Sequence, residues 1–214
     1  MTLNRRDVLV FSAAASATSL IGAGPTYAAE GDQHDEAKLM QPEGVTDRFI
    51  GGEDAAVTVI EYASPTCPHC ATFHVNTLPK LEETYIDTKK IKFILRPFVR
   101  NVLDAVVFMV AEAAGDDAYY SIVDAYFHTQ AEWAQSDRPR DALMAVALQH
   151  GFTEESFEAA LTNQELFEGM EAARDQALNE FDLTGTPTFY INGKQLSGDK
   201  TFDELAAEID PRLG

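Results

Sequence analysis

The chain has 214 residues, 45% of them hydrophobic, and a formal net charge of −19 at pH 7. This length allows one domain with a full hydrophobic core and room for an inserted unit. The strong negative charge argues against nucleic acid and against an anionic membrane surface as binding partners.

The N-terminal residues 1–28 predict an export signal. Arg5 and Arg6 precede a moderately apolar run over residues 8–23, and Ala28 ends a small-residue cleavage site. The paired arginines and the weak apolar run favour a signal of twin-arginine type, with a general-secretion signal as the alternative. The mature chain is then expected in the periplasm, where disulfides persist. Residues 29–44 are polar and predict a flexible leader.

A β-α-β unit is expected after the leader. Residues 57–62 are β-branched and apolar, which is typical of a buried strand, and residues 91–99 predict a second one. A helix is expected to begin at Pro68, because proline suits the first helical position. Pro79 lies inside the helical pattern and predicts a kink. The order of these elements implies a right-handed crossover between parallel strands.

The rest of the chain changes from helices back to strands. Residues 101–180 repeat apolar side chains at helical spacing and predict an all-helical block. Two short strands then surround Asn192-Gly193, which is a strong hairpin signal. A final helix is expected to follow this hairpin. The predicted fold class is α/β, with a helical block between a β-α-β unit and a β-β-α unit.

Two capping boxes are predicted from the pattern of a threonine followed three residues later by a glutamate. Thr162 with Glu165 predicts the start of the last helix of the helical block. Thr201 with Glu204 predicts the start of the C-terminal helix.

The chain has two cysteines, Cys67 and Cys70, in the segment ASPTCPHCATF. They could form a structural staple, half of a metal site, or a redox couple. A disulfide loop of four residues constrains the unfolded chain by only roughly 2 kcal/mol, so it would be a weak staple. A closed zinc site needs four ligands, and no second Cys or His pair with suitable spacing follows, while His74 is expected on the helix surface. The pattern favours a redox couple without metal or cofactor.

The CPHC motif and the order of elements resemble the DsbA-type thiol:disulfide oxidoreductases, which have a thioredoxin fold with an inserted all-helical domain. Three features carry the resemblance: Cys67-Pro68-His69-Cys70, the GTPTF segment at 185–189, and Glu61 six residues before Cys67. It covers roughly residues 45–210. It implies a thioredoxin-like domain over residues 45–100 and 181–214, with the helical insertion over residues 101–180.

Thiol exchange assigns different roles to the two cysteines. Cys67, at the N-terminal end of the helix, is expected to be the exposed attacking thiolate. The helix dipole supplies roughly 0.3–1 kcal/mol at an exposed end, so N–H···S bonds and the imidazole of His69 must supply most of the stabilisation. Cys70 is expected to be the sheltered resolving thiol. Glu61, if buried beneath Cys70, would take or relay its proton.

The resemblance also implies a substrate-binding loop. Pro187 matches the cis-proline that faces the redox pair in the family, so the backbone of Thr186 would be open to pairing with an extended peptide. Thr186 itself departs from several family members, which have a β-branched apolar residue at this position. The position tunes substrate affinity and redox poise in the family.

The sequence therefore predicts a monomeric oxidoreductase that donates the Cys67–Cys70 disulfide to reduced exported proteins through a mixed disulfide on Cys67. A membrane quinone-linked oxidase is the re-oxidant that the resemblance implies. A disulfide isomerase or reductase of the same fold remains an alternative, although about 16 residues before the fold are too few for an added dimerisation domain. A non-catalytic thioredoxin-like binding or chaperone module is the other alternative.

Overall fold

The structure is a computed structural model that describes residues 31–214. The predicted export signal and the first two residues of the predicted leader lie outside the described residues. Within residues 31–214, no helix combines the length and the apolar character needed to cross a membrane.

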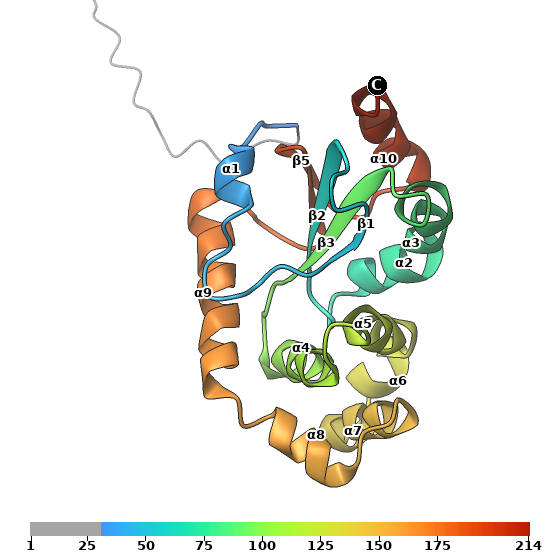
Figure 1. The fold of residues 1–214 in the computed structure, drawn as a ribbon. Helices are drawn as coiled ribbons and strands as arrows, with labels where there is room; N and C mark the ends of the chain where they lie inside the picture. Colours follow the sequence, from blue (N-terminus) through green and yellow to red (C-terminus); the bar gives the residue numbers. More distant parts are fainter. Residues whose placement is uncertain (1–30) are drawn as a thin grey trace, which may run out of the picture.

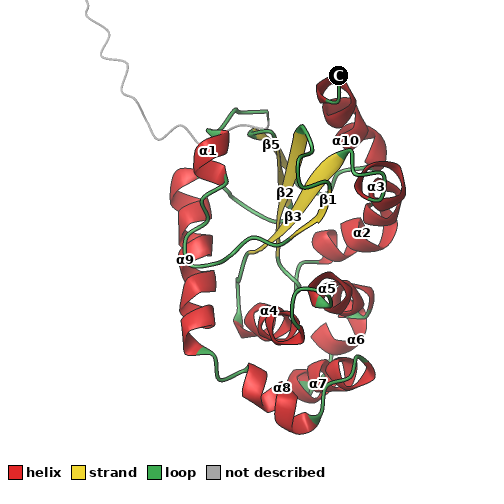
Figure 2. Cartoon of the chain, in the orientation of Figure 1, coloured by secondary structure: helices red, strands yellow, loops and turns green. Residues whose placement is uncertain are grey.

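A five-stranded sheet lies at the centre of the fold, with the strand order β1-β3-β2-β4-β5. The strands are β1 (Phe49–Gly51), β2 (Val57–Ala63), β3 (Ile91–Pro97), β4 (Thr188–Ile191) and β5 (Lys194–Ser197) (Figure 2). β2 and β3 are parallel, as the β-α-β order predicts, whereas the other neighbouring strands are antiparallel.

Helices cover both faces of this sheet. Helices α1 and α9 lie on one face, α2, α3 and α10 lie on the other, and α4 to α8 form a block at one end (Figure 1). The bounds are α1 (Glu36–Leu39), α2 (Pro68–Asn76), α3 (Leu78–Leu81), a π-helical turn (Glu82–Ile86), α4 (Val102–Ala114), α5 (Tyr119–His128), α6 (Gln130–Ala134), α7 (Pro139–Gln149), α8 (Glu154–Ala160), α9 (Gln164–Glu180), α10 (Phe202–Ile209) and a 3-10 turn (Asp210–Arg212). This arrangement agrees with the predicted α/β class.

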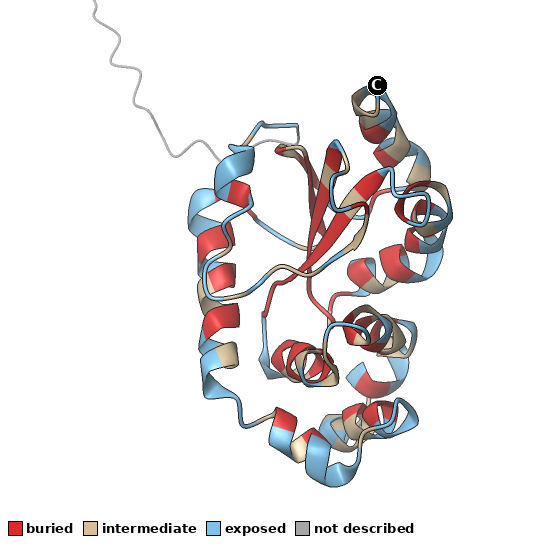
Figure 3. Ribbon diagram, viewed as in Figure 1, coloured by how far each residue is buried: buried red, intermediate tan, exposed pale blue. Residues whose placement is uncertain are grey.

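The alternation of side chains along β2 decides which of them face the dithiol helix. Ile60 and Tyr62 join the buried cluster on the α1 and α9 side of the sheet. Val59 and Ala63 join the larger cluster that contains both cysteines. Since successive side chains point to opposite faces, Glu61 lies on the same side as Val59 and Ala63, under α2. The whole strand is buried except for a partly exposed Thr58 (Figure 3).

Helix α2 presents one buried face to the sheet. Its buried residues Cys70, Phe73 and His74 are spaced three and four apart, which places them on the same face. α2 ends at Asn76, and a separate short helix, α3, begins at Leu78. The kink predicted at Pro79 is therefore confirmed as a break, because proline has no N–H to donate to the preceding turn.

Residues 31–44 differ from the flexible leader that the sequence predicts. Gln33 forms a β-bridge with Lys194 at the edge of the sheet. The Asp35 carboxylate caps α1, and Leu39 is 1% exposed in the cluster on that face of the sheet. Gly44 passes so close to α9 that a Cβ atom there would lie 2.6 Å from the backbone of Gly169. The β-bridge, the buried Leu39 side chain and the close approach of Gly44 to α9 thus hold this polar segment against the fold.

A buried charged cluster joins the segment before β1 to the sheet. Arg96 of β3 is 1% exposed. Its Nε and Nη2 atoms donate to the two carboxylate oxygens of Asp47 at 2.7 and 2.5 Å, and its Nη1 donates to the Tyr62 hydroxyl at 2.9 Å. Two parallel bonds to one carboxylate make this the strong, bidentate form of the pair. Asp47 therefore neutralises the one fully buried guanidinium among the described residues.

Candidate active site

The two cysteines lie at the N-terminal end of α2. Cys67 is the N-cap residue in an extended conformation, Pro68 is the first helical residue, and Cys70 lies one turn further in. Both are free thiols. Cys70 is 0% exposed and Cys67 is 4% exposed. The predicted exposure of Cys67 is wrong, because the loop that carries Thr186 lies against it, with the Thr186 carbonyl oxygen 3.2 Å from the Cys67 sulfur.

Hydrogen bonds lower the pKa of Cys67 from an ordinary value of 9.0 to about 5. The largest contribution is the hydrogen bond from the Cys70 thiol, and burial opposes it. The Thr186 side chain and the backbone N–H groups of Cys70 and His69 lower the pKa further. The Thr186 hydroxyl is buried without a partner among the described residues, which leaves it available to the thiolate. The site is therefore built for a negative charge on Cys67.

His69 contributes through its backbone. The sequence predicts a role for its imidazole, whereas the group that hydrogen-bonds the Cys67 sulfur is the backbone N–H. The side chain of His69 lies in an exposed part of the motif, as does Pro68. The helix N-terminus thus supplies directed donors to the sulfur, in addition to its dipole.

The second thiol, that of Cys70, is stabilised in its protonated form. The pKa of Cys70 is raised well above its ordinary value, first by burial, then by its hydrogen bond to Cys67, and then by the charge of Glu61. In the reduced protein at neutral pH, Cys67 is therefore the thiolate and Cys70 is the thiol. One sulfur is ready to attack, and the other keeps its proton until a base removes it.

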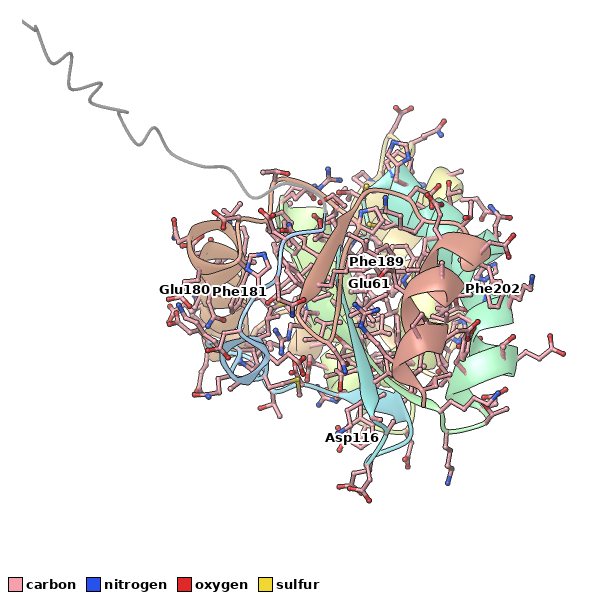
Figure 4. All side chains as sticks on the ribbon, turned by 90° about the horizontal axis from the view of Figure 1, so that it is seen from above. Glu61, Asp116, Glu180, Phe181, Phe189 and Phe202 are labelled. Carbon is pink, nitrogen blue, oxygen red and sulfur yellow. The ribbon has the colours of Figure 1, made fainter. Side chains whose placement is uncertain are left out.

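Glu61 lies beneath the dithiol, as the resemblance implies. It is 0% exposed and is paired across the sheet with Phe189 (Figure 4). Its Oε2 atom lies 3.1 Å from Nε2 of His74, which is 2% exposed and stacks on Phe127. The predicted surface position of His74 is wrong. The spacing of four residues from Cys70 was a usable signal, since it places both side chains on one face of the helix.

The loop opposite the cysteines has the form that the resemblance implies. The Thr186–Pro187 peptide bond is cis. The Thr188 hydroxyl donates to the Gly185 carbonyl at 2.8 Å, and the Pro187 carbonyl accepts from the Gly198 N–H at 2.9 Å. These bonds fix the loop at the start of β4, next to Cys67.

The helical block anchors the other side of the site. The buried carboxylate of Asp104, in α4, accepts from the Ser64 hydroxyl at 2.8 Å and from the Thr66 N–H at 2.7 Å. The Gln130 side chain, in α6, donates to the carbonyls of Pro65 and Cys67 at 2.6 and 2.8 Å. Neither residue was predicted from the sequence. Nothing in a lone aspartate or glutamine signals a contact with a loop 38 or 63 residues away in the chain.

The described part of the chain contains no group of three His, Cys, Asp or Glu side chains that could hold a metal ion. The ionisable groups that the structure places at the site include the two thiols and the buried Glu61–His74 pair.

A dithiol at the start of α2, a cis-proline loop beside it and a buried carboxylate under it define a thioredoxin-like thiol protein. The chain belongs to the thioredoxin family, since the family model described as Thioredoxin matches residues 43–211.

Individual relatives agree with this assignment. A protein of Rickettsia felis that carries the name protein-disulfide oxidoreductase is 31% identical over 168 residues, which are 78% of this chain and 60% of that protein. The chain thus spans less than two thirds of that relative. The crystal structure of alpha-DsbA1 from Wolbachia pipientis is similar with a TM-score of 0.77 and 26% identity, covering 85% of this chain and 96% of that one.

A further structure, oxidised BdbD from Bacillus subtilis, has a TM-score of 0.70 and 22% identity, covering 86% of this chain and 98% of that one, and it supports the fold alone. Together these similarities confirm the predicted resemblance to DsbA-type proteins. They also confirm the predicted thioredoxin fold with a helical insertion.

Proposed function

We propose that this protein is a protein-disulfide oxidoreductase of the periplasm that donates the Cys67–Cys70 disulfide to reduced exported proteins. The observation that carries the proposal is the opposite tuning of two adjacent thiols: a pKa of about 5 for Cys67 and a pKa well above the ordinary value for Cys70. A thiol with a low pKa is a good leaving group in disulfide exchange. The name of the relative in Rickettsia felis and the fold shared with alpha-DsbA1 support the same activity.

The reaction proceeds in two exchanges that transfer two electrons from the substrate. A substrate thiolate attacks the Cys67 sulfur, the Cys67–Cys70 bond breaks, and Cys70 leaves with the electron pair and takes up a proton. A second substrate thiolate then attacks the substrate sulfur of the mixed disulfide, and Cys67 leaves as a thiolate. The substrate has gained a disulfide and the protein is reduced.

The loop beside Cys67 is the substrate-binding element in this proposal. An extended peptide pairs in β fashion with the backbone of Thr186, and Pro187 fixes that backbone in place. The reduced protein acts as a monomer and passes its two electrons to a membrane quinone-linked oxidase, as in the proteins it resembles. A disulfide isomerase and a non-catalytic binding module remain the competing functions.

The function is tested by mixing oxidised protein with a reduced, unfolded protein substrate and, separately, with a scrambled one. We expect disulfides to form in the reduced substrate faster than with glutathione disulfide at an equal concentration, because Cys67 leaves as a stabilised thiolate. Rescue of the scrambled substrate without net oxidation would indicate an isomerase instead. No effect on either substrate would indicate that the protein is a non-catalytic binding module.

The stability of the two redox states is expected to depend on pH in a defined direction. The folded-state pKa of Cys67, about 5, lies below the unfolded value near 8.5, so the thiolate stabilises the reduced fold. This contribution is complete above about pH 8.5 and is lost as the pH falls through about 5. At pH 7 we expect the oxidised protein, which has no thiolate, to melt roughly 5 °C below the reduced protein.

Differential scanning calorimetry of both redox states between pH 5 and 7 measures this difference. The gap between the two melting temperatures should narrow as the pH approaches 5. The raised pKa of Cys70 does not affect the comparison, because it matters only above the unfolded thiol value. Equal melting temperatures at pH 7, or a gap that widens toward pH 5, would contradict a strong disulfide donor.

A further inference from the structure

The buried pair beneath the dithiol has two polar atoms that it does not use. Glu61 and His74 share one hydrogen bond of 3.1 Å between Oε2 and Nε2. Oε1 of Glu61 and Nδ1 of His74 are buried and have no hydrogen-bond partner among the described residues. Leaving such atoms unpaired costs free energy, so each one in a well-packed core calls for an explanation. The pair is unsatisfied at both of its ends.

One end of the pair interacts with Cys70. The carboxylate of Glu61 lies on the α2 side of the sheet, and its charge raises the pKa of Cys70. Cys70 is fully buried, so no solvent molecule at the surface of the protein can protonate it directly. When the disulfide opens and Cys70 leaves as a thiolate, its proton has to come from a neighbouring side chain. The hydrogen bond between Glu61 and His74, beneath Cys70, contains such a proton.

Glu82, the first residue of the π-helical turn, interacts electrostatically with His74. The side chain of Glu82 is half-buried, and burial is the main cause of its raised pKa, followed by the charges of Asp124 and Asp87. The charge of His74 lowers the same pKa, so the imidazole and this carboxylate are near enough to interact. Glu82 therefore binds a proton more readily than an ordinary glutamate does, at a position that solvent can still reach.

The surroundings of the pair are otherwise apolar. The His74 ring stacks on Phe127 of α5 at 3.9 Å and meets the edge of Phe73. The titratable groups that interact with the pair include Cys70 on α2, Glu82 on the π-helical turn and Tyr120 of α5. The pKa of Tyr120 is raised mainly by burial and in part by the charge of Glu61. The stacking holds the imidazole in one orientation beside the Glu61 carboxylate.

We propose that His74 is a positioning residue that relays a proton between Glu82 at the surface and Glu61 beneath Cys70. This inference rests on the proposed function, because it concerns the protonation of Cys70 during disulfide exchange. As the Cys67–Cys70 bond breaks and Cys70 departs with the electron pair, the Glu61–His74 pair gives it a proton. The pair then regains a proton from solvent through Glu82.

Re-oxidation runs the same relay in reverse. Once Cys67 is joined to the re-oxidant in a mixed disulfide, the Cys70 thiol gives its proton to the pair, and its sulfur attacks the Cys67 sulfur. The Cys67–Cys70 bond forms, the sulfur of the re-oxidant leaves as a thiolate, and the proton passes to solvent by way of His74 and Glu82.

The relay is tested with His74→Gln, which can still donate a hydrogen bond to Glu61 but cannot accept a proton and pass it on. Reduced protein is mixed with glutathione disulfide, and samples are acid-quenched, alkylated and resolved by mass spectrometry. The first rate constant reports attack by Cys67, and the second reports ring closure by Cys70. We expect the first to stay within about twofold and the second to fall by a factor on the order of 10², the usual contribution of a general acid or base.

Two further variants sharpen the result. Glu82→Gln should also slow ring closure, by a smaller factor than His74→Gln, and raising the pH should restore part of the rate in both. His150→Gln is the matched control, because this exposed histidine directly follows α7 in the helical block, and both rate constants of the variant should equal those of the wild type.

Ring closure at the wild-type rate in a folded His74→Gln protein would overturn the relay. An equal fall in both rate constants would overturn it as well, since that would indicate a general disturbance of the site. Neither result depends on the substrate assay of the proposed function, because glutathione disulfide replaces the substrate here. A failure of the protein to oxidise reduced proteins would overturn the function and leave the ring-closure comparison standing.

Discussion

Serine in place of Cys67 is expected to abolish disulfide exchange, whereas serine in place of Cys70 is expected to stop it halfway. Cys67 carries the thiolate that attacks and leaves, since its pKa is about 5 and that of Cys70 is well above the ordinary value. Without Cys67 no mixed disulfide can form at this site. Without Cys70 the mixed disulfide forms on Cys67 but has no internal thiol to resolve it.

Non-reducing electrophoresis and mass spectrometry after incubation with glutathione disulfide distinguish these two outcomes. Cys67→Ser should remain unmodified, and Cys70→Ser should accumulate one stable glutathione adduct per chain. Val75→Ser is the matched control, because it places a serine on the exposed side of the same helix and should exchange like the wild type. Adducts on the Cys67→Ser protein, or none on the Cys70→Ser protein, would show that the roles of the two thiols are misassigned.

Asp47→Asn is expected to cause a large loss of stability. The substitution keeps the shape of the side chain and removes the charge that neutralises Arg96, which is 1% exposed. Breaking a buried ion pair from one side typically costs about 3–5 kcal/mol, because the remaining charge is left uncompensated. For a chain of this size, that loss lowers the melting temperature by roughly 10 °C.

Urea unfolding of the variant and of Asp175→Asn measures this difference with the same chemical change at both positions. Asp175 pairs with Arg174 at 2.7 Å, but its side chain is 57% exposed, so its removal should cost less than about 1 kcal/mol. Equal losses in the two variants would show that the buried cluster contributes no more than a surface pair. An unchanged slope of the urea dependence confirms that both variants unfold in the same way.

Much of the fold was accessible from short-range patterns. The strand β2 follows from its β-branched run, and the hairpin follows from Asn192-Gly193, whose positive φ angles of 44° and 82° suit a tight turn between strands. The capping box of Thr201 and Glu204 is confirmed at the start of α10. In each case the residues that determine the structure are neighbours in the chain.

The features of the fold that the sequence did not predict correctly depend on packing rather than on local sequence signals. The cap predicted at Thr162 is wrong, because the Asn163 amide oxygen accepts from the Leu166 N–H at 3.0 Å and caps α9 instead. Asparagine and threonine are both good N-cap residues, and only the packing of the helix decides between them. Strand β1 has three residues, too few for an alternating pattern, and it exists because β3 offers an open edge.

The candidate site likewise contains some residues that the sequence predicts and others that it does not. Cys67, Cys70, Glu61 and Pro187 lie together as the motif and the resemblance predict. His74 was missed because a lone histidine on a helix is usually a surface residue. Its spacing of four residues from Cys70 nevertheless places it on the same, buried face of α2. Asp104 and Gln130 could not be found, since contacts between distant segments leave no local pattern.

These last two residues mean that the helical insertion cannot be treated as a detachable module. A shortened chain in which a linker replaces residues 101–180 would retain every letter of the CPHC motif and the proline loop. It would lose the carboxylate that binds Ser64 and Thr66 and the amide that binds the carbonyls of Pro65 and Cys67. Transplanting this dithiol into another thioredoxin scaffold would therefore require the graft to include its supports from α4 and α6.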